Sequence, residues 1–317
     1  MRKRKLGNSS LEIAPWALGG NVFGWTADEP TSFRILDAFV AAGFDFIDTA
    51  DVYSAWVPGH QGGESETVLG NWMKLRANRK KVLIATKVGK PMGPDKKGLS
   101  RTYVLRAVVD SLKRLQTDYI DLYQSHEDDP SISLEETTEA FALLIKQGKV
   151  RAIGASNYSG DRLAQSLQVS KQLGVSRYES LQPNYNLYDR AEFETTLEPV
   201  CQKNNIGVIS YFSLASGFLT GKYRSEADLS NSPRGRMVKK YLNPRGIRIL
   251  DALDQVAKQH DSTPAKVSLA WLLGRSSVTA PIASATNLKQ LDDLIGATNL
   301  RLDPSSIELL NQASAYN

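Results

Sequence analysis

The feature that most constrains the fold is a repeated alternation between short apolar segments and longer segments with helical spacing. The apolar segment 44–48, for example, is followed by a helical pattern at 64–76, and the segment 82–88 is followed by one at 101–115. Strands that alternate with helices through right-handed crossovers form a parallel sheet. Eight such units in about 300 residues are typical of a closed (β/α)8 barrel, the TIM barrel of the α/β class, rather than of an open sheet.

The predicted elements follow one another without a change in composition, so a single domain is expected over residues 1–317. A small β-hairpin around Gly7 and Asn8 is predicted at 3–13, before the barrel. A long segment without strands, 213–248, is expected after the seventh strand, where barrel enzymes carry functional loops. The predicted barrel strands are 16–18, 44–48, 82–88, 120–126, 150–156, 178–182, 207–211 and 279–283.

The helix ends carry recognisable signals. Ser100 is predicted to cap a helix that ends at Leu115, and Ser133 to cap the next one, with Glu136 completing a capping box. A continuous helix is predicted at 190–205, and it contains the only cysteine, Cys201. A single cysteine excludes a disulfide within the chain and is expected to be a core residue.

Charge and hydropathy exclude several classes of protein. The chain has 39 basic and 34 acidic residues, a net charge of +5, which is too mild an excess to indicate a nucleic-acid partner. It is compatible with a small anionic ligand. The basic N-terminus lacks the apolar stretch of a signal peptide, and no apolar run approaches the roughly 20 residues of a membrane span. The expectation is a cytoplasmic protein without membrane contact.

Four chemically distinct side chains lie at or just beyond the ends of three predicted strands: Asp48, Tyr53, Lys87 and His126. Barrel enzymes place their chemistry at the carboxyl ends of the strands, so we expect the four to converge. A free tyrosine has a pKa of about 10, too high for efficient proton donation near neutrality. An ammonium at ~4 Å attracts a phenolate by about 4 kcal/mol at an effective dielectric of ~20.

After desolvation, this attraction predicts a net lowering of the Tyr53 pKa by about one or two units. Asp48 is expected to keep Lys87 charged and oriented, and His126 to donate a hydrogen bond to a carbonyl oxygen. Together these groups suit protonation of a carbonyl oxygen while hydride reaches the carbon. No side chain supplies hydride, so a nicotinamide cofactor is indicated.

Each residue also has an ordinary interpretation. Asp48 could cap a loop, Tyr53 could be a packing residue, and His126 could be a solvated strand end, whereas Lys87 within an apolar strand needs a charge partner. The other chemistries fit poorly. The three histidines lack metal-ligand spacing, and neither a nucleophile elbow nor a Gly-rich dinucleotide fingerprint occurs. A Schiff-base aldolase that uses Lys87 would leave Tyr53 unexplained.

The sequence resembles the aldo-keto reductases over nearly its whole length, in the longer branch that includes potassium-channel β subunits. The resemblance is carried by FIDTADVY, IATKV and YQSH around the four residues above, and by IGASN, LQPNYN and YFSLASGFLTGKY further along. It implies a (β/α)8 barrel that reduces aldehydes or ketones, with NADPH, or alternatively NADH, at its C-terminal mouth. Tyr53 would be the general acid, supported by Asp48, Lys87 and His126.

The resemblance also implies roles for further residues. The nicotinamide carboxamide would be held by Ser156, Asn157 and Gln182, with Asp48 close to it and Tyr211 stacked on the ring. Trp25, Trp56 and His126 would face the substrate, a small carbonyl compound, and no metal is expected. The remaining predicted cofactor contacts are Gly20 and Asn21 in the first loop, Ser213, Leu214, Gly217, Leu219 and Lys222 near the pyrophosphate, and Thr286, Gln290 and Asp293 near the adenosine.

Two departures from the family pattern bear on function. Many relatives carry arginine at the Thr286 position and asparagine at the Leu294 position, where they hold the adenosine phosphate and the adenine. Lys289 or a basic residue within 234–245 is a candidate replacement for the arginine.

The alternative function is a nicotinamide-binding regulatory subunit, like the potassium-channel β subunits of the same fold. In those subunits asparagine matches His126, so the histidine here favours catalysis. The sequence leaves the oligomeric state open.

Overall fold

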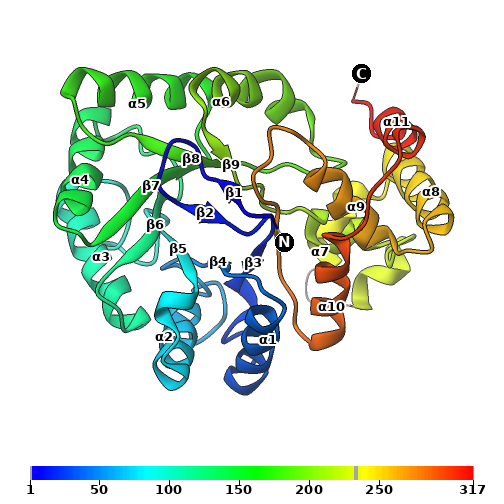
Figure 1. Ribbon diagram of the computed structural model, residues 1–317, viewed down its shortest axis with the longest axis horizontal. Coiled ribbons are helices and arrows are strands. Elements are labelled where there is room, and N and C mark those ends of the chain that lie inside the picture. Colours follow the sequence, from blue (N-terminus) through cyan, green and yellow to red (C-terminus); the bar gives the residue numbers. More distant parts are fainter. Residues whose placement is uncertain (1, 232–234, 317) are drawn as a thin grey trace.

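A computed structural model describes residues 2–231 and 235–316, and in this part of the chain eight parallel strands form one sheet (Figure 1). The end strands also meet, because Ala280 N donates to Val208 O at 3.1 Å and Ile282 N donates to Ser210 O at 2.8 Å. The sheet therefore closes into the predicted (β/α)8 barrel. In sheet order the strands are β10 (Ile282–Ala283), β3 (Ala17–Gly19), β4 (Phe46–Asp48), β5 (Leu83–Val88), β6 (Ile120–Ser125), β7 (Val150–Ser156), β8 (Tyr178–Gln182) and β9 (Gly207–Val208).

Helices surround the strands on the outside of the ring (Figure 1). Amphipathic patterns and side-chain caps account for them; Ser100, for example, accepts a hydrogen bond from Tyr103 N. The helices are α1 (Glu29–Ala41), α2 (Glu64–Arg76), α3 (Arg101–Leu115), α4 (Leu134–Lys146), α5 (Gly160–Leu173), α6 (Glu198–Asn204), the short α7 (Gly235–Val238), α8 (Pro244–Gln259), α9 (Pro264–Leu273), α10 (Leu288–Ala297) and α11 (Pro304–Ala313).

The register of the strands sets the functional end of the barrel. Asp48 pairs with Ala85, and Lys87, two residues further along β5, pairs with Gln124. Ser156 pairs with Gln182 at the ends of β7 and β8. The last residues of neighbouring strands are thus brought to the same end, where the sequence predicted the site.

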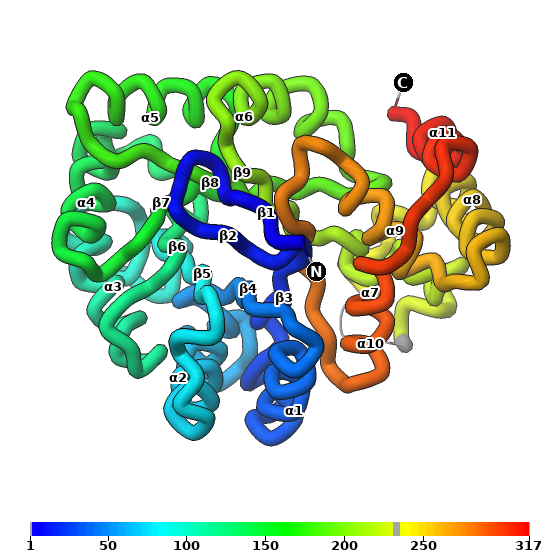
Figure 2. Tube along the Cα trace, in the orientation of Figure 1, coloured from blue at the N-terminus to red at the C-terminus, as the bar shows by residue number. Residues whose placement is uncertain are grey.

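The predicted N-terminal hairpin is confirmed, with β1 (Arg4–Lys5) antiparallel to β2 (Glu12–Ile13). It crosses the other end of the barrel, over the starts of the strands (Figure 2). Its turn contains Gly7 at φ +57°, and a Cβ there would lie 2.3 Å from Glu179 O. A side chain at this position would therefore require the backbone to move, which explains the glycine.

Three local predictions are corrected. The helix predicted at 190–205 is interrupted by a π-helical turn, Phe193–Leu197, because Pro199 has no N–H to continue the regular hydrogen bonding. Glu136 does not complete the capping box at Ser133; its Oε1 accepts from Arg101 N at 2.8 Å and so caps α3 instead. The strands predicted at 207–211 and 279–283 are shorter, since regular pairing ends at Val208 and begins at Ile282.

The predicted long segment follows β9 and has no strand among its described residues. It holds short helical turns, Ala215–Thr220, Glu226–Asn231 and Lys239–Tyr241, together with α7. It ends earlier than expected, because Asn243 caps α8 through Gly246 N and Pro244 occupies the first turn. Arg245 and Arg248 consequently belong to a helix rather than to a loop.

Cys201 is buried in α6, as predicted, and burial raises the pKa of its thiol to about 12.

Candidate active site

Lys87 is the centre of the site, at the end of β5, and its side chain is completely buried. Its Nζ donates to Asp48 Oδ2 at 2.6 Å, to Thr49 O at 2.8 Å and to Tyr53 Oη at 3.2 Å. All three ammonium protons therefore have acceptors. This arrangement offsets the desolvation cost of the buried charge, because the ammonium is both paired and fully hydrogen-bonded.

The charges of this cluster shift two pKa values. Burial alone lowers the pKa of Lys87, but the charges and hydrogen bonds of Asp48 and Tyr53 together outweigh burial and raise it. Lys87 thus stays an ammonium at neutral pH. Burial raises the pKa of Tyr53, and the opposing effect of Lys87 is smaller. The predicted net lowering of the Tyr53 pKa is wrong, because the phenolate loses more solvation than the ammonium returns.

His126 follows β6 and lies beside Tyr53. Its ring lies 5.9 Å from that of Tyr53, centroid to centroid, at an interplanar angle of 74°. Burial, with the charges of Lys87 and Lys90, holds the pKa of His126 well below its usual value. The imidazole is therefore neutral at physiological pH and has one N–H to donate. Asp48, Tyr53, Lys87 and His126 converge as the sequence predicted.

Asp48 is oriented by two amides as well as by the ammonium. Its Oδ1 accepts from Gln182 Nε2 at 2.9 Å and from Gln124 Nε2 at 3.3 Å. Gln182 was predicted as a carboxamide contact, and here its amide also fixes the acid. Gln124 was not predicted, although its place in YQSH, beside the register position of Lys87, is the signal that could have found it.

The loop that carries Tyr53 is tied to the start of α2. Glu64 accepts from the backbone N–H groups of Ser54 and Gly62, at 3.0 and 3.1 Å. Trp56 lies edge-on to Tyr53, with ring centroids 5.6 Å apart, and Trp25 lies edge-on to Trp56 at the same separation. Of the predicted substrate-facing tryptophans, Trp56 is therefore beside the phenol, with 49% of it exposed, and Trp25 is beside Trp56.

The side chains predicted to hold the nicotinamide are adjacent at the ends of β7, β8 and β9. Ser156 Oγ donates to Gln182 O at 2.9 Å, and Asn157 Nδ2 donates to His126 O at 2.8 Å. Tyr211 Oη donates to Asn157 Oδ1 at 2.8 Å. Asn157 thus links Tyr211 to the backbone of His126.

The predicted pyrophosphate segment follows β9 as an irregular turn. Ser213 Oγ donates to Ser210 O at 3.1 Å. Within the turn, Leu219 N donates a hydrogen bond to Leu214 O at 3.2 Å. Gly217 has φ +96°, and a Cβ there would lie 3.7 Å from Lys222 Nζ. The Lys222 ammonium therefore lies over this backbone, and its side chain is exposed.

The predicted adenosine residues lie after β10. Gln290 Oε1 accepts from both Thr286 N and Thr286 Oγ1, at 2.9 and 3.1 Å. The carboxylate of Asp293 forms an ion pair with Lys266 at 3.2 Å. Lys289 is exposed and forms no ion pair with a described residue. Arg234, within the basic segment considered above, is outside the described residues.

The first-loop residues Gly20 and Asn21 follow β3, the neighbour of β10 in the sheet. Gly20 O accepts from Ser65 Oγ at 2.8 Å, which links the loop to α2. Asn21 Oδ1 accepts from Ser284 Oγ at 2.5 Å, which links it to the segment after β10. The loop thus joins the first and last units of the barrel.

Residues 15–315 match the sequence pattern of the Aldo/keto reductase family. The chain belongs to the aldo/keto reductase family. It is similar to "Uncharacterized oxidoreductase YrpG" of Bacillus subtilis, at 35% identity over 96% of this chain and 94% of the relative. It is also similar to "Protein tas" of Escherichia coli, at 31% identity over 100% and 99%. A third relative, "Probable voltage-gated potassium channel subunit beta" of Arabidopsis thaliana, is 30% identical over 95% of this chain and 92% of its own.

Family membership makes this chain an oxidoreductase of the nicotinamide-dependent, carbonyl-reducing class. The geometry of this aldo/keto reductase argues against the Schiff-base alternative, because Lys87 is held as an ammonium whose protons are all donated. In the described part of the chain no group of three or more potential metal ligands occurs. Nor does any helix there combine the length and apolar character needed to cross a bilayer.

One buried acid in the reductase was not predicted. Asp51, two residues before Tyr53, is 1% exposed, and neither of its carboxyl oxygens has a hydrogen-bond partner among the described residues. Burial raises its pKa well above the usual value, and the charge of Glu66 adds to the effect. The folded state therefore binds a proton at Asp51 that the unfolded state releases near pH 4.

The Asp51→Asn variant is expected to gain stability relative to the natural chain as the pH rises. Below about pH 4 both states of the natural chain hold the proton, so the two proteins should differ little. Above that pH the natural chain should lose up to about 1.4 kcal/mol per pH unit relative to the variant, until the raised pKa is reached. Urea unfolding between about pH 4 and 8 measures the difference. Asp292→Asn, at an exposed position, is the control, and parallel curves for Asp51→Asn and the natural chain would contradict the prediction.

Proposed function

We propose that this protein reduces aldehydes or ketones to alcohols, with Tyr53 as the proton donor. The observation that carries the proposal is the position of Lys87 Nζ, which contacts both Asp48 Oδ2 at 2.6 Å and Tyr53 Oη at 3.2 Å. The raised pKa keeps the phenol protonated at neutral pH but makes it a weaker acid, so proton donation depends on the neighbouring ammonium. The nearby ammonium stabilises the phenolate that forms as the carbonyl oxygen takes the proton.

The neutral imidazole of His126 gives the site its second donor. A carbonyl oxygen beside Tyr53 Oη would accept hydrogen bonds from both the phenol and the His126 N–H, which orients its carbon. Trp56 and Trp25 provide apolar surfaces for the rest of the substrate, and we propose that the loops bearing them determine which carbonyl compounds bind.

NADPH is the proposed cofactor, and it supplies the hydride when bound. The donor set fits it, since Ser156, Asn157 and Gln182 offer hydroxyl and amide groups next to His126. Lys222 offers an exposed ammonium over the turn at Gly217, where a pyrophosphate would be held. Gly217 has φ +96°, a conformation that other residues rarely adopt, which explains the glycine in this turn.

Two measurements test the proposal. One is turnover of a generic aromatic aldehyde with NADPH and with NADH, and the other is fluorescence titration of the protein with each cofactor. Binding and turnover that both depend on a nicotinamide would support a reductase. Tight NADPH binding with negligible turnover of a panel of aldehydes would identify a regulatory subunit instead. Failure to bind either cofactor would refute the proposed function.

Lys289 is the exposed cation nearest in sequence to the Thr286 position, and we propose that it contacts the adenosine phosphate of NADPH. Lys289→Gln is expected to weaken NADPH binding about tenfold, the loss of one charge-assisted contact, and to leave NADH binding unchanged. Fluorescence titrations of both cofactors measure this. Lys258→Gln, another exposed lysine, is the control. An unchanged ratio of the two affinities would exclude Lys289 from this role.

A further inference from the structure

A second region of the molecule concentrates positive charge, at the N-terminal end of the barrel. One cavity there, of 710 Å³, has five cationic side chains in its lining and no carboxylate. Much of the remaining wall is formed by proline, phenylalanine, isoleucine, threonine and asparagine side chains. The five cationic residues, called here the basic cavity residues, are Arg2, Lys3, Arg4, Lys5 and Arg301.

Most of this charge is unpaired. Lys3 forms an ion pair with Asp45 at 2.6 Å, whereas Arg2, Lys5 and Arg301 form none with any described residue. Arg301 uses only Nη1 for hydrogen bonds, both to backbone carbonyls close to it in sequence. Its remaining donors are directed to no described protein group.

Arg4 is held rigidly among these cations. Its Nη1 donates to Val278 O and its Nη2 to Leu273 O, each at 2.9 Å, so the guanidinium is fixed by the segment that precedes β10. Burial lowers the pKa of Arg4, and the charge of Arg301 lowers it further. Two guanidinium groups thus repel each other across a cavity wall that contains no acid to separate them.

We propose that this cavity binds a small anion that carries two or more phosphate groups. Guanidinium groups match phosphate oxygens in geometry as well as in charge, and three arginines are among the lining residues. A volume of 710 Å³ is within the range of small-molecule sites. A multiply charged ligand would replace the mutual repulsion of the cations with attraction.

The surroundings favour a small molecule over a macromolecule. None of the exposed large apolar side chains of the described chain, such as Trp56, Leu75 and Met237, lines the cavity, so nothing there could insert into a lipid surface. The one aromatic lining residue, Phe44, is buried and cannot stack on a nucleic-acid base.

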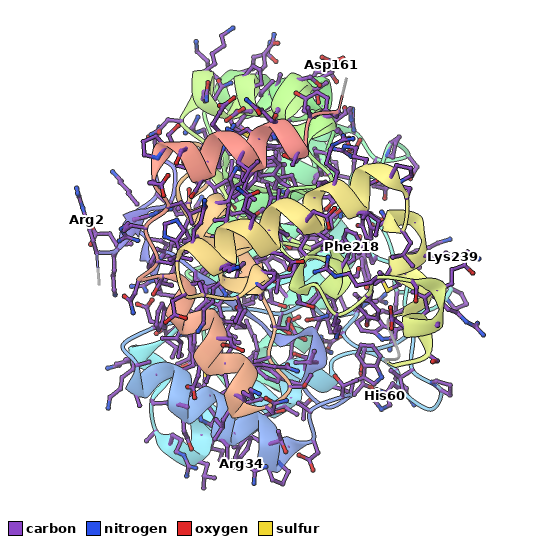
Figure 3. All side chains as sticks on the ribbon, turned by 90° about the vertical axis from the view of Figure 1, so that its right-hand side faces the viewer. Arg2, Arg34, His60, Asp161, Phe218 and Lys239 are labelled. Carbon is purple, nitrogen blue, oxygen red and sulfur yellow. The ribbon has the colours of Figure 1, made fainter. Side chains whose placement is uncertain are left out.

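This cavity is separate from the candidate active site. Figure 3 shows Arg2 on one side of the molecule, and His60, from the loop after Tyr53, together with Lys239, from the segment after β9, toward the opposite side. The hairpin that carries Arg4 and Lys5, with Arg2 and Lys3 just before it, crosses the starts of the strands, not their ends. The proposal therefore does not depend on the proposed function.

Calorimetric titration of the full-length protein with tripolyphosphate tests the proposal. The protein first receives one molar equivalent of NADPH, or of NADH should that bind better, so that its cofactor site cannot take up the probe and no excess dinucleotide competes for the cavity. We expect saturable binding in about 20 mM salt that weakens strongly in about 200 mM salt. Inorganic phosphate, with fewer charges, should bind at least about tenfold more weakly.

The double variant Arg2→Gln/Arg301→Gln removes two exposed charges and is expected to weaken tripolyphosphate binding at least tenfold. The control, Lys113→Gln/Lys171→Gln, changes the net charge equally at exposed positions outside the cavity and should bind as the natural chain does. Equal thermal stability of all three proteins excludes a folding defect. The proposal would be overturned if tripolyphosphate did not bind, or if its binding were weakened equally in the Arg2→Gln/Arg301→Gln variant and in the control. Tighter binding to anionic vesicles or RNA than to tripolyphosphate would also overturn it.

Discussion

Replacing Tyr53 with phenylalanine is expected to lower aldehyde reduction by a factor of about 10²–10⁴ while cofactor binding is retained. The variant removes only the hydroxyl, which is the proposed proton donor and lies 3.2 Å from Lys87 Nζ. General acid catalysis by a positioned side chain contributes a factor of about this size. Single-turnover reduction of an aldehyde, with cofactor affinity measured by fluorescence in parallel, separates the two effects.

Tyr119→Phe is the matched control. It removes a tyrosine hydroxyl just before β6, at the opposite end of the strand from His126, and should leave reduction unchanged. If Tyr53→Phe lost cofactor affinity and turnover by the same factor, the residue would be a binding group and its assignment as the proton donor would fail. Retained turnover would likewise remove Tyr53 from the chemistry.

Lys87→Met should damage both activity and stability. The substitution leaves the Asp48 carboxylate, 2% exposed, without the ammonium that lies 2.6 Å from it. Removing one partner of a buried ion pair typically costs about 3–5 kcal/mol in the free energy of unfolding. Reduction should also be lost, because nothing would then stabilise the phenolate of Tyr53. Urea unfolding and single-turnover kinetics measure the two losses separately.

A double variant distinguishes the two roles of the lysine. Asp48→Asn/Lys87→Met removes both charges, so much of the lost stability should return while reduction remains abolished. Recovery of activity together with stability would show that Lys87 matters only for folding. Full stability of Lys87→Met alone would mean that the pair contributes little to the native state.

The sequence predicted the barrel well where the pattern is local. The bounds of α2, α3, β7 and β8 agree with the predicted ranges, because each has a clear period and a clear stop. The prediction failed where a single residue alters the hydrogen bonding, as Pro199 does in the helix around 190–205. It also failed at β9, where apolar residues continue beyond the end of regular pairing, and at β10, where the predicted segment begins before regular pairing starts.

For the site, the residue types and their order were enough to predict that Asp48, Tyr53, Lys87 and His126 meet. The sign of the Tyr53 pKa shift could not be predicted in the same way, because it depends on how deeply the phenol is buried relative to its distance from the ammonium. The hydrogen bonds of Gln182 and Gln124 to Asp48 depend on strand register, which residue spacing along one strand does not reveal.

The three hydrogen bonds of Lys87 have a consequence for the durability of the protein. Aldehydes condense with neutral amines, so a reductase that concentrates aldehydes near a lysine risks covalent self-modification by its own substrates. Here the amine stays protonated, because its pKa is raised and Asp48, Thr49 and Tyr53 accept hydrogen bonds from its three N–H groups. An ammonium has no lone pair with which to attack an aldehyde. The contacts that prepare Tyr53 for its proposed role thus also render the central amine chemically inert toward electrophiles.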